Sequence, residues 1–381
     1  MTLRAPKPFD SPVYVARPML PPLEEYVALL RGVWERKWLT NNGQLLLELE
    51  RRLCGHLGAE FLSVFTNGTL GLEVGLRALD LKGEVITTPF TFPATPNAIR
   101  VTGLEPVFVD IDPETWTIDP RAVERAISPA TSAILGVHVY GMPCHVEELE
   151  AIGRRHGLKV IYDGAHAFGT RVAGRPISTF GDMTMFSFHA TKLFHAAEGG
   201  ALIVREASVK RRVDLLRNFG ILDESTVVEA GSNSKMTELQ AALGLLVFDR
   251  VEAERAARAR VAAVYEQRIS TIPGLIPFHL PPQVEDSRQY WIVRVDERKA
   301  GIGRDALVEG LKRFNIFARR YFYPLVSEAA HLRGCRGADL GSLPVAARVS
   351  REVISLPYFG ELGEEGAHRI VDAIAAVCGR E

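Results

Sequence analysis

The sequence predicts an α/β protein with a larger domain on a mostly parallel mixed sheet and a smaller C-terminal α+β domain. Strand-like and helix-like hydrophobic patterns alternate from residue 61 onward, which is typical of βαβ units. Residues 237–268 are rich in Ala, Glu, Leu and Arg and predict one long helix that bridges two domains. The length of 381 residues also favours two domains. We place them at residues 1–255, including the N-terminal segment, and 256–381.

The elements can be assigned in chain order. Residues 23–38 and 45–57 have helical patterns, and the sequence Thr40-Asn41-Asn42-Gly43 separates them. Strands and helices then alternate over residues 61–65, 70–79, 84–87, 95–101, 106–109, 121–127, 132–137, 145–155 and 158–162, and two further strands are predicted at 183–188 and 201–204. Beyond Pro273 the segments 289–295, 305–314, 316–320, 345–353 and 364–377 predict the smaller α+β domain.

Composition excludes several classes of function. Lys plus Arg total 45 and Asp plus Glu total 46. The net charge of −1 provides no overall positive potential that would attract nucleic acid or an anionic membrane. The four cysteines are scattered without a metal-binding or redox spacing, and we expect no metal. The N-terminal residues have no apolar signal region and no stretch could span a bilayer, so a cytoplasmic protein is expected.

An amine and a carboxylate each follow an apolar strand. The strand over 183–188 leads into a polar turn that carries Lys192, and the strand over 158–162 leads into Asp163. The carboxyl ends of strands line the ligand crevice of an open α/β sheet, so these two groups could bind opposite parts of one small molecule. Pyridoxal phosphate needs a lysine for its aldehyde and an acid for its ring nitrogen. Alternatively, Lys192 is simply solvated, and Asp163 is a helix cap or a structural ion-pair partner.

A strand-to-helix junction offers a candidate phosphate site. Gly68 and Thr69 lie where a helix begins, and helix N-termini favour phosphate through free amides and the helix dipole. A capped helix start without a ligand is the more common explanation of such a junction. Ser187 ends the strand before Lys192, where its hydroxyl could complete the phosphate site or merely alternate with its phenylalanine neighbours.

Two rings follow strand ends. Phe92 could cover a planar pyridine ring, although interior packing is the more frequent role of a single phenylalanine. His166 could donate a hydrogen bond to the phenolic oxygen of the cofactor, or it could be a satisfied core histidine. The sequence lacks the motifs of dinucleotide-binding, Walker A, zinc-protease and serine-hydrolase sites, so those chemistries lose support.

The chain resembles the DegT/DnrJ/EryC1/StrS family of sugar aminotransferases, a branch of the fold-type I pyridoxal phosphate enzymes. The similarity covers nearly the whole chain. The matching motifs are Trp38-Leu39-Thr40-Asn41-Asn42-Gly43, Asn67-Gly68-Thr69, Gly83-Glu84-Val85-Ile86, Thr91-Phe92-Pro93-Ala94-Thr95, Pro106-Val107-Phe108-Val109-Asp110, His138-Val139-Tyr140-Gly141, Asp163-Gly164-Ala165-His166-Ala167-Phe168-Gly169, Ser187-Phe188-His189-Ala190-Thr191-Lys192, Glu198-Gly199-Gly200, Arg217-Asn218-Phe219-Gly220 and Asn233-Ser234-Lys235-Met236.

The resemblance implies a role for each candidate residue. Lys192 would bond to the aldehyde of pyridoxal 5'-phosphate, Asp163 would pair with the pyridine nitrogen, and Phe92 would stack on the ring. His166 would contact the phenolic oxygen, and Gly68, Thr69 and Ser187 would bind the phosphate. The family forms a homodimer with shared active sites, so Asn233 of the neighbouring subunit would bind the same phosphate. Tyr321 and Tyr323 would contact the substrate.

The resemblance also implies the reaction. L-glutamate would leave its amino group on the cofactor as pyridoxamine 5'-phosphate, and a nucleotide-linked keto sugar would then receive it. The motifs around Lys192 and Tyr321 favour C4 of a 4-keto-6-deoxyhexose over C3 of a 3-keto sugar. Lys192 argues against the family branch that has histidine at this position and removes a sugar hydroxyl. Ser234, Lys235 and His195 depart from the common pattern, which leaves the sugar open. A rival hypothesis is a non-catalytic regulatory protein that binds the cofactor.

Overall fold

The structure is a computed structural model that describes residues 6–379. A central sheet of seven strands has the order β2-β10-β9-β6-β5-β3-β4. Only β10 runs antiparallel to its neighbours, which confirms the predicted mostly parallel mixed sheet. The strands are β2 (Phe61–Phe65), β3 (Glu84–Thr87), β4 (Glu105–Phe108), β5 (Thr131–Val137), β6 (Lys159–Asp163), β9 (Met183–Ser187) and β10 (Gly200–Val204).

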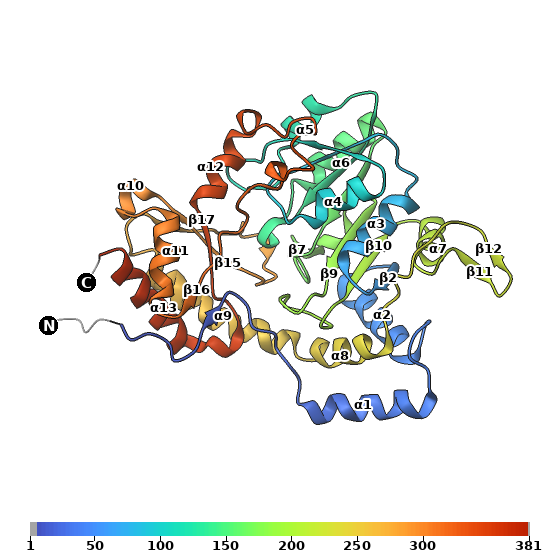
Figure 1. The fold of residues 1–381 in the computed structure, drawn as a ribbon, viewed down its shortest axis with the longest axis horizontal. Coiled ribbons are helices and arrows are strands. Elements are labelled where there is room, and N and C mark those ends of the chain that lie inside the picture. The colour runs from blue at the N-terminus through green and yellow to red at the C-terminus, as the bar shows by residue number, and fades with distance from the viewer. Residues whose placement is uncertain (1–5, 380–381) are drawn as a thin grey trace.

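Helices cover both faces of this sheet (Figure 1). Alternate strand residues point to opposite faces, and the two faces belong to separate hydrophobic clusters: Val160 and Tyr162 pack in one, Ile161 in the other. The first cluster includes residues of α2 (Gln44–Leu57), α5 (Pro120–Ala126), α6 (Val146–His156) and α8 (Glu238–Phe248). The second includes residues of α3 (Gly68–Ala78), α4 (Ala94–Val101) and α7 (Ala207–Leu216).

The predicted long helix over 237–268 is wrong, because the structure has two helices there. After α8 the chain makes a turn at Asp249 and Arg250, and α9 (Val251–Ile269) follows. Local propensity favours helix throughout, but α8 packs in the core of the central sheet and most of α9 packs in the C-terminal core. The guanidinium of Arg250 donates to the carbonyl of Leu246 across the break (2.9 Å). Packing against two different cores therefore overrides propensity.

The C-terminal part forms its own core around a three-stranded sheet of order β13-β15-β17. Val13 of the N-terminal segment packs in this core, and β1 pairs in parallel with β16. The proposed boundary between residues 255 and 256 stays a prediction. The elements of this part are β13 (Leu275–Pro277), β15 (Trp291–Val295), β16 (Ile316–Phe317), β17 (Val353–Leu356), α10 (Glu297–Ala300), α11 (Arg304–Lys312), α12 (Pro344–Glu352) and α13 (Gly363–Val377), with β1 at Val13–Tyr14.

Several smaller elements lie outside these two cores. Helix α1 (Leu23–Arg36) lies along one side of α8, and a hairpin extends away from the body on the right of Figure 1. Within residues 6–379, no helix has both the length and the apolar character needed to cross a membrane. The remaining strands are β7 (Arg171–Val172), β8 (Arg175–Pro176) and β14 (Val284–Glu285), which form a small sheet, and β11 (Ile221–Asp223) and β12 (Thr226–Val227), which form the hairpin.

Candidate active site

A cavity of about 540 Å³ opens at the carboxyl ends of the parallel strands. The loops after β2, β3, β6 and β9 and the carboxyl ends of β5, β6 and β9 supply most of its wall, as the position of ligand sites in such sheets predicts. Arg319 and Tyr321 reach it from the C-terminal part. The predicted site residues that line it are Gly68, Thr69, Phe92, Asp163, His166, Ser187, Lys192 and Tyr321.

Asp163 is a buried carboxylate at the end of β6. Its side chain is 4% exposed, and it accepts hydrogen bonds from the Thr95 hydroxyl (2.8 Å) and the Ala165 amide (3.0 Å). Burial raises the pKa of Asp163 above its ordinary value, while these two donors and the charge of Lys192 act in the opposite direction. Within residues 6–379 no cation lies at ion-pair distance from this carboxylate. The site therefore holds an acid that lacks a positive partner.

Lys192 lies in a turn beyond β9, and its backbone amide donates to the carbonyl of His189 (2.8 Å). The Nζ atom lies 5.8 Å from the ring centroid of Tyr290. Burial lowers the pKa of Lys192, and the neighbouring Tyr321 and Asp163 only partly oppose this effect. A lowered pKa increases the fraction of neutral amine near neutral pH, which is the nucleophilic form.

His166 is fixed in one hydrogen-bonding state by the backbone. Its Nδ1 atom accepts from the Tyr140 amide (3.2 Å), so a neutral ring carries its proton on Nε2. Burial, with a smaller contribution from Lys192, holds the pKa of His166 well below its ordinary value. The ring stacks with those of Tyr140 and Phe322 and is nearly perpendicular to that of Tyr290. His166 is thus a neutral hydrogen-bond donor on the wall of the cavity.

The beginning of α3 forms the end of the cavity near β2 and β9. Asn67 caps the helix by accepting from the Leu70 amide (2.9 Å). A Cβ atom on Gly200 would lie 2.6 Å from the Cα atom of Gly68, and one on Gly68 would lie 2.9 Å from the Sδ atom of Met185. Glycine is therefore needed at position 200, where a Cβ atom would meet the backbone of Gly68, whereas at position 68 the flexible Met185 side chain would have to shift.

Phe92 does not pack in the interior, so that alternative for its role is wrong. Its side chain is 53% exposed and lines the cavity. A largely exposed aromatic ring beside a buried acid and an amine offers an apolar face to a planar ligand. The neighbouring Thr91 and Thr95 hydroxyls are 2.7 Å apart, and the Thr95 hydroxyl donates a hydrogen bond to Asp163.

Two other predicted residues lie outside this cavity. Tyr323 is 43% exposed, and its ring lies 5.0 Å from the guanidinium of Arg304 instead of facing the site. Asn233 is exposed, and its Oδ1 atom accepts from the ammonium of Lys235 (2.9 Å). The role predicted for Asn233 belongs to a neighbouring subunit, so it stays a prediction.

Sequence reasoning missed several residues that belong to the site. Thr95 and Tyr290 contact the predicted residues from distant parts of the chain, and Arg319 lines the cavity. Thr95 lies in the motif 91–95 and could have been considered, because the motif follows a strand end. Nothing in the local sequence distinguishes Tyr290.

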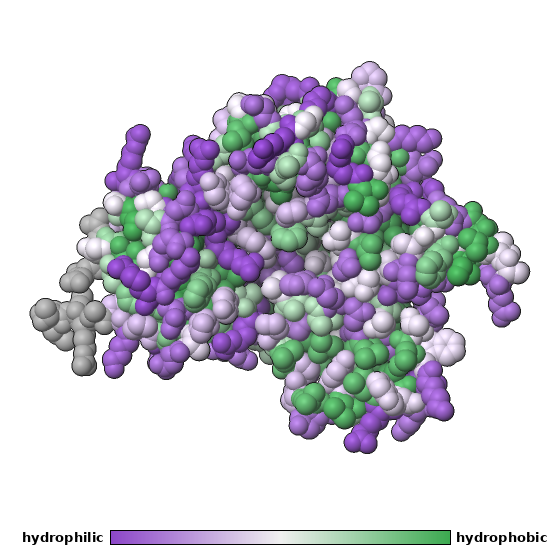
Figure 2. All heavy atoms as spheres, in the orientation of Figure 1, coloured by the Kyte–Doolittle hydropathy of each residue, from purple (hydrophilic) through white to green (hydrophobic). Residues whose placement is uncertain are grey.

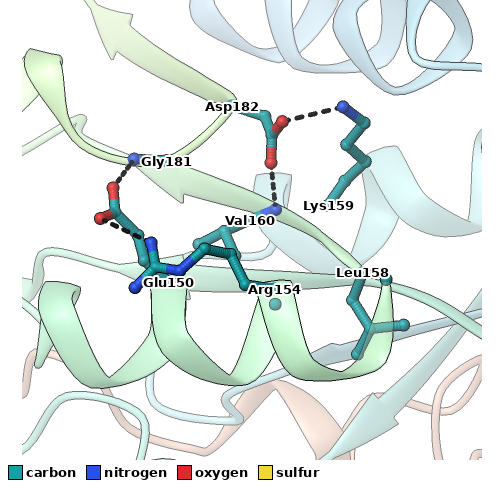
Figure 3. Close-up of a pocket in the computed structure, with 9 residues that line it drawn as sticks. Glu150, Arg154, Leu158, Lys159, Val160, Gly181 and Asp182 are labelled. Carbon is teal, nitrogen blue, oxygen red and sulfur yellow. Dashed lines mark hydrogen bonds and ion pairs between the residues drawn. The ribbon is translucent and has the colours of Figure 1, made fainter.

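A second hollow, of about 430 Å³, lies at the opposite end of β6 (Figure 3). The ammonium of Lys159 lies 2.9 Å from the carboxylate of Asp182, which also accepts from the Val160 amide (2.8 Å). Glu150 accepts from the Gly181 amide (2.7 Å) and lies 3.8 Å from Arg154. These charged groups are already paired with one another, so this hollow offers a ligand little that its own residues do not satisfy.

The fold and the cavity define the class of protein. A solved structure described as DesI in the presence of its TDP-sugar product superposes with a TM-score of 0.92 at 37% identity, covering 98% of this chain and 95% of that chain. The structure of an aminotransferase, TlmJ of Streptoalloteichus hindustanus, superposes with a TM-score of 0.88 at 27% identity, covering 96% of this chain and 99% of that chain. The protein is therefore an aminotransferase of fold-type I.

The family follows from the sequence match. The model of the DegT/DnrJ/EryC1/StrS aminotransferase family matches residues 23–375, and the chain belongs to this family. A dTDP-4-amino-4,6-dideoxy-D-glucose transaminase of Escherichia coli is 42% identical over 359 residues, which cover 93% of this chain and 96% of the relative. The predicted family and the predicted transaminase activity are confirmed.

Proposed function

We propose that this protein uses pyridoxal 5'-phosphate to transfer an amino group from L-glutamate to C4 of a nucleotide-linked 4-keto-6-deoxyhexose. The observation that carries the proposal is that Asp163 and Lys192 line one cavity and that neither has an ion-pair partner within residues 6–379. A buried charge is costly without a partner. A ring with a protonated nitrogen and an aldehyde supplies a partner for both groups.

The other residues of the cavity fit the same cofactor. Phe92 offers an exposed aromatic face, and His166 offers an Nε2 donor for a phenolic oxygen. Gly68 and Thr69 begin α3, whose N-terminal amides and dipole favour a phosphate, and Ser187 adds a hydroxyl at the same end. Asp163 thus corresponds to the ring nitrogen of the cofactor, Lys192 to its aldehyde and Phe92 to its ring face. The N-terminus of α3 corresponds to its phosphate.

Each residue then has a chemical task. Pyridoxal 5'-phosphate supplies an aldehyde that takes up an amino group and a ring that withdraws electrons. Asp163 keeps the ring nitrogen protonated, which requires the carboxylate to remain charged when that nitrogen is its partner. Lys192 Nζ would accept the proton from the α-carbon of the amino donor and later return a proton, because burial lowers its pKa and so increases the neutral fraction of this amine.

The transaminase relative supports C4 as the position of amination. Its name specifies a 4-amino-4,6-dideoxy sugar linked to dTDP, and the DesI structure contains a TDP-sugar product. Arg319 lines the cavity, is exposed and has no carboxylate partner within the described residues. We assign its guanidinium to an anionic group of the substrate.

A homodimer with shared active sites completes the proposal. Exposed apolar side chains gather on α1 at the bottom of Figure 2 and on the hairpin at its right. Such patches on a polar surface mark protein interfaces. Asn233 lies near the base of this hairpin, outside the cavity of its own chain. The apolar residues are Leu23, Val27 and Trp34 of α1 with Leu20 just before it for the first patch, and Ile221, Leu222, Val227 and Val228 for the second.

The test combines cofactor capture with product analysis. We expect the purified protein to bind pyridoxal 5'-phosphate and, after borohydride reduction and peptide mapping, to carry it on Lys192. With L-glutamate and either a dTDP-4-keto-6-deoxyhexose or the corresponding 3-keto sugar, mass spectrometry should detect the amino product of the 4-keto sugar only. A product from the 3-keto sugar alone would reject C4. A bound cofactor that never responds to any amine would favour the regulatory protein.

A further inference from the structure

The segment Ser287–Tyr290 enters the C-terminal sheet just before β15 and touches both loops that carry the candidate catalytic groups. The hydroxyl of Ser287 donates to the carbonyl of His166 (2.8 Å). The rings of Tyr290 and His166 are nearly perpendicular, with centroids 4.8 Å apart, and the Tyr290 centroid lies 5.8 Å from the Nζ atom of Lys192. This short segment thus connects the C-terminal part of the chain to the carboxyl ends of β6 and β9.

Gln289 makes the most specific contact of this segment. Its Oε1 atom accepts from the Leu193 amide (2.6 Å), and its Nε2 atom donates to the Thr191 carbonyl (2.9 Å). These two groups belong to the peptide bonds immediately before and after Lys192. One side-chain amide therefore holds both peptide planes that set the direction of the Lys192 Cα–Cβ bond.

The site makes these two hydrogen bonds hard to replace. Gln289 is 5% exposed and Leu193 is 1% exposed, so water has little access to the Leu193 amide. A buried donor without an acceptor is costly, and the turn would have to move to satisfy it. Lys192 itself makes only one backbone hydrogen bond within its turn, to His189.

We infer that Gln289 is a positioning residue that holds the Lys192 amine at the reactive position of the cavity. The inference rests on the proposed function, because it takes Lys192 as the residue that bonds to the cofactor. A reacting group displaced by about 1 Å loses on the order of a hundredfold in rate. Fixing the backbone on both sides of Lys192 while leaving its side chain free to move suits an amine that must alternate between bonding and proton transfer.

The experiment measures how fast Lys192 captures pyridoxal 5'-phosphate in three variants that start without cofactor. In Gln289→Leu both hydrogen bonds are lost, and we expect capture to slow by roughly 10- to 100-fold. Tyr265→Phe is the matched control, because it also removes one buried hydrogen bond to a carbonyl in the C-terminal core, that with Pro357 (2.8 Å). Thermal unfolding of both variants corrects for a general loss of stability.

Gln289→Glu provides a rescue that a purely structural role would not give. A protonated glutamic acid has one donor and one acceptor, like the amide, whereas the carboxylate has no donor for the Thr191 carbonyl. Because burial raises the pKa of a carboxyl group above its ordinary value of about 4.3, capture by this variant should recover, relative to the wild type, as the pH is lowered from 8 towards 5. Equal capture rates in Gln289→Leu and Tyr265→Phe, or no pH-dependent recovery, would overturn the inference.

The same measurements separate this inference from the proposed function. If the wild type forms no borohydride-reducible bond at Lys192, the proposed function fails and the inference fails with it. If the wild type forms that bond and Gln289→Leu forms it at the same rate and pH dependence, the function stands and Gln289 has only a structural role.

Discussion

The two ends of strand β6 carry the same residue types in opposite electrostatic states. At the amino end, Lys159 and Asp182 form an ion pair of 2.9 Å, and this hydrogen bond raises the pKa of Lys159. At the carboxyl end, Lys192 and Asp163 share a cavity without an ion-pair contact, and burial lowers the pKa of Lys192 while raising that of Asp163. A hollow opens at each end, but at the carboxyl end neither charged group has an ion-pair partner within residues 6–379.

This difference identifies a ligand site better than the size of a hollow does. Paired surface charges lose little when they stay as they are, and exposed ion pairs contribute only about 0–1 kcal/mol. Buried groups with shifted pKa values and no partner gain most from a ligand that completes them. The comparison therefore predicts that equivalent substitutions at the two ends have different consequences.

The largest expected effect is on turnover. Lys192→Ala should lower kcat by about 10²–10⁴-fold or more, because it removes the base that moves the proton. Lys159→Ala, the matched change at the other end, should leave kcat within about twofold. Steady-state assays with L-glutamate and the 4-keto sugar check both. Transamination by Lys192→Ala at a rate near that of the wild type would show that the amine at the carboxyl end is no more important for catalysis than the one at the amino end.

The acids should differ in cofactor affinity. Asp163→Asn removes the partner of the ring nitrogen and should weaken binding of pyridoxal 5'-phosphate by roughly a hundredfold, about 3 kcal/mol. Asp182→Asn should leave that affinity unchanged.

Without cofactor, Asp163→Asn should be at least as stable as the wild type at neutral pH. The pKa of Asp163 is raised in the folded protein, so its ionisation above pH 3.8 costs stability in the wild type. Absorbance titration and thermal unfolding measure the two effects.

Phe92 should contribute a smaller part of the affinity. Phe92→Leu keeps an apolar side chain but removes the aromatic face, so we expect the cofactor to bind up to about tenfold more weakly, in line with about 0.5–1.5 kcal/mol for an aromatic contact. The cofactor-free protein should unfold at nearly the same temperature, because this side chain is 53% exposed. A large fall in unfolding temperature would instead indicate a packing role.

The smallest effect concerns the pH dependence of stability without cofactor. The pKa of Lys192 is lowered in the folded protein, so Lys192→Met should be more stable than the wild type below that pKa, and the gain should vanish as pH rises to 10.5. The pKa of Lys159 is raised, so Lys159→Met should instead lose up to about 1 kcal/mol below pH 10.5. Denaturant unfolding at pH 7 and 10 compares them. The same sign for both variants would contradict the difference between the two ends.

Much of the fold was predictable because hydrophobic periodicity is local. Strand β3 was predicted at its observed bounds, and the two N-terminal helices within two residues of theirs. The break between α8 and α9 was not predicted, because the local sequence favours helix on both sides and only packing against two cores separates them. Helix α7 and the small sheet of β7, β8 and β14 were also missed, since the short strands have no clear period.

By itself the sequence determined the family, the order of the main strands and helices, and the two strand ends that carry Asp163 and Lys192, because these depend on residue identity and local pattern. Only the tertiary structure decided that both groups line one cavity and that neither has an ion-pair partner among the described residues 6–379. It also decided the contacts of Thr95 with Asp163, 68 residues apart, and of Gln289 with Thr191, 98 residues apart. Such contacts exist only after the chain has folded, since packing and burial set the distances and the pKa values.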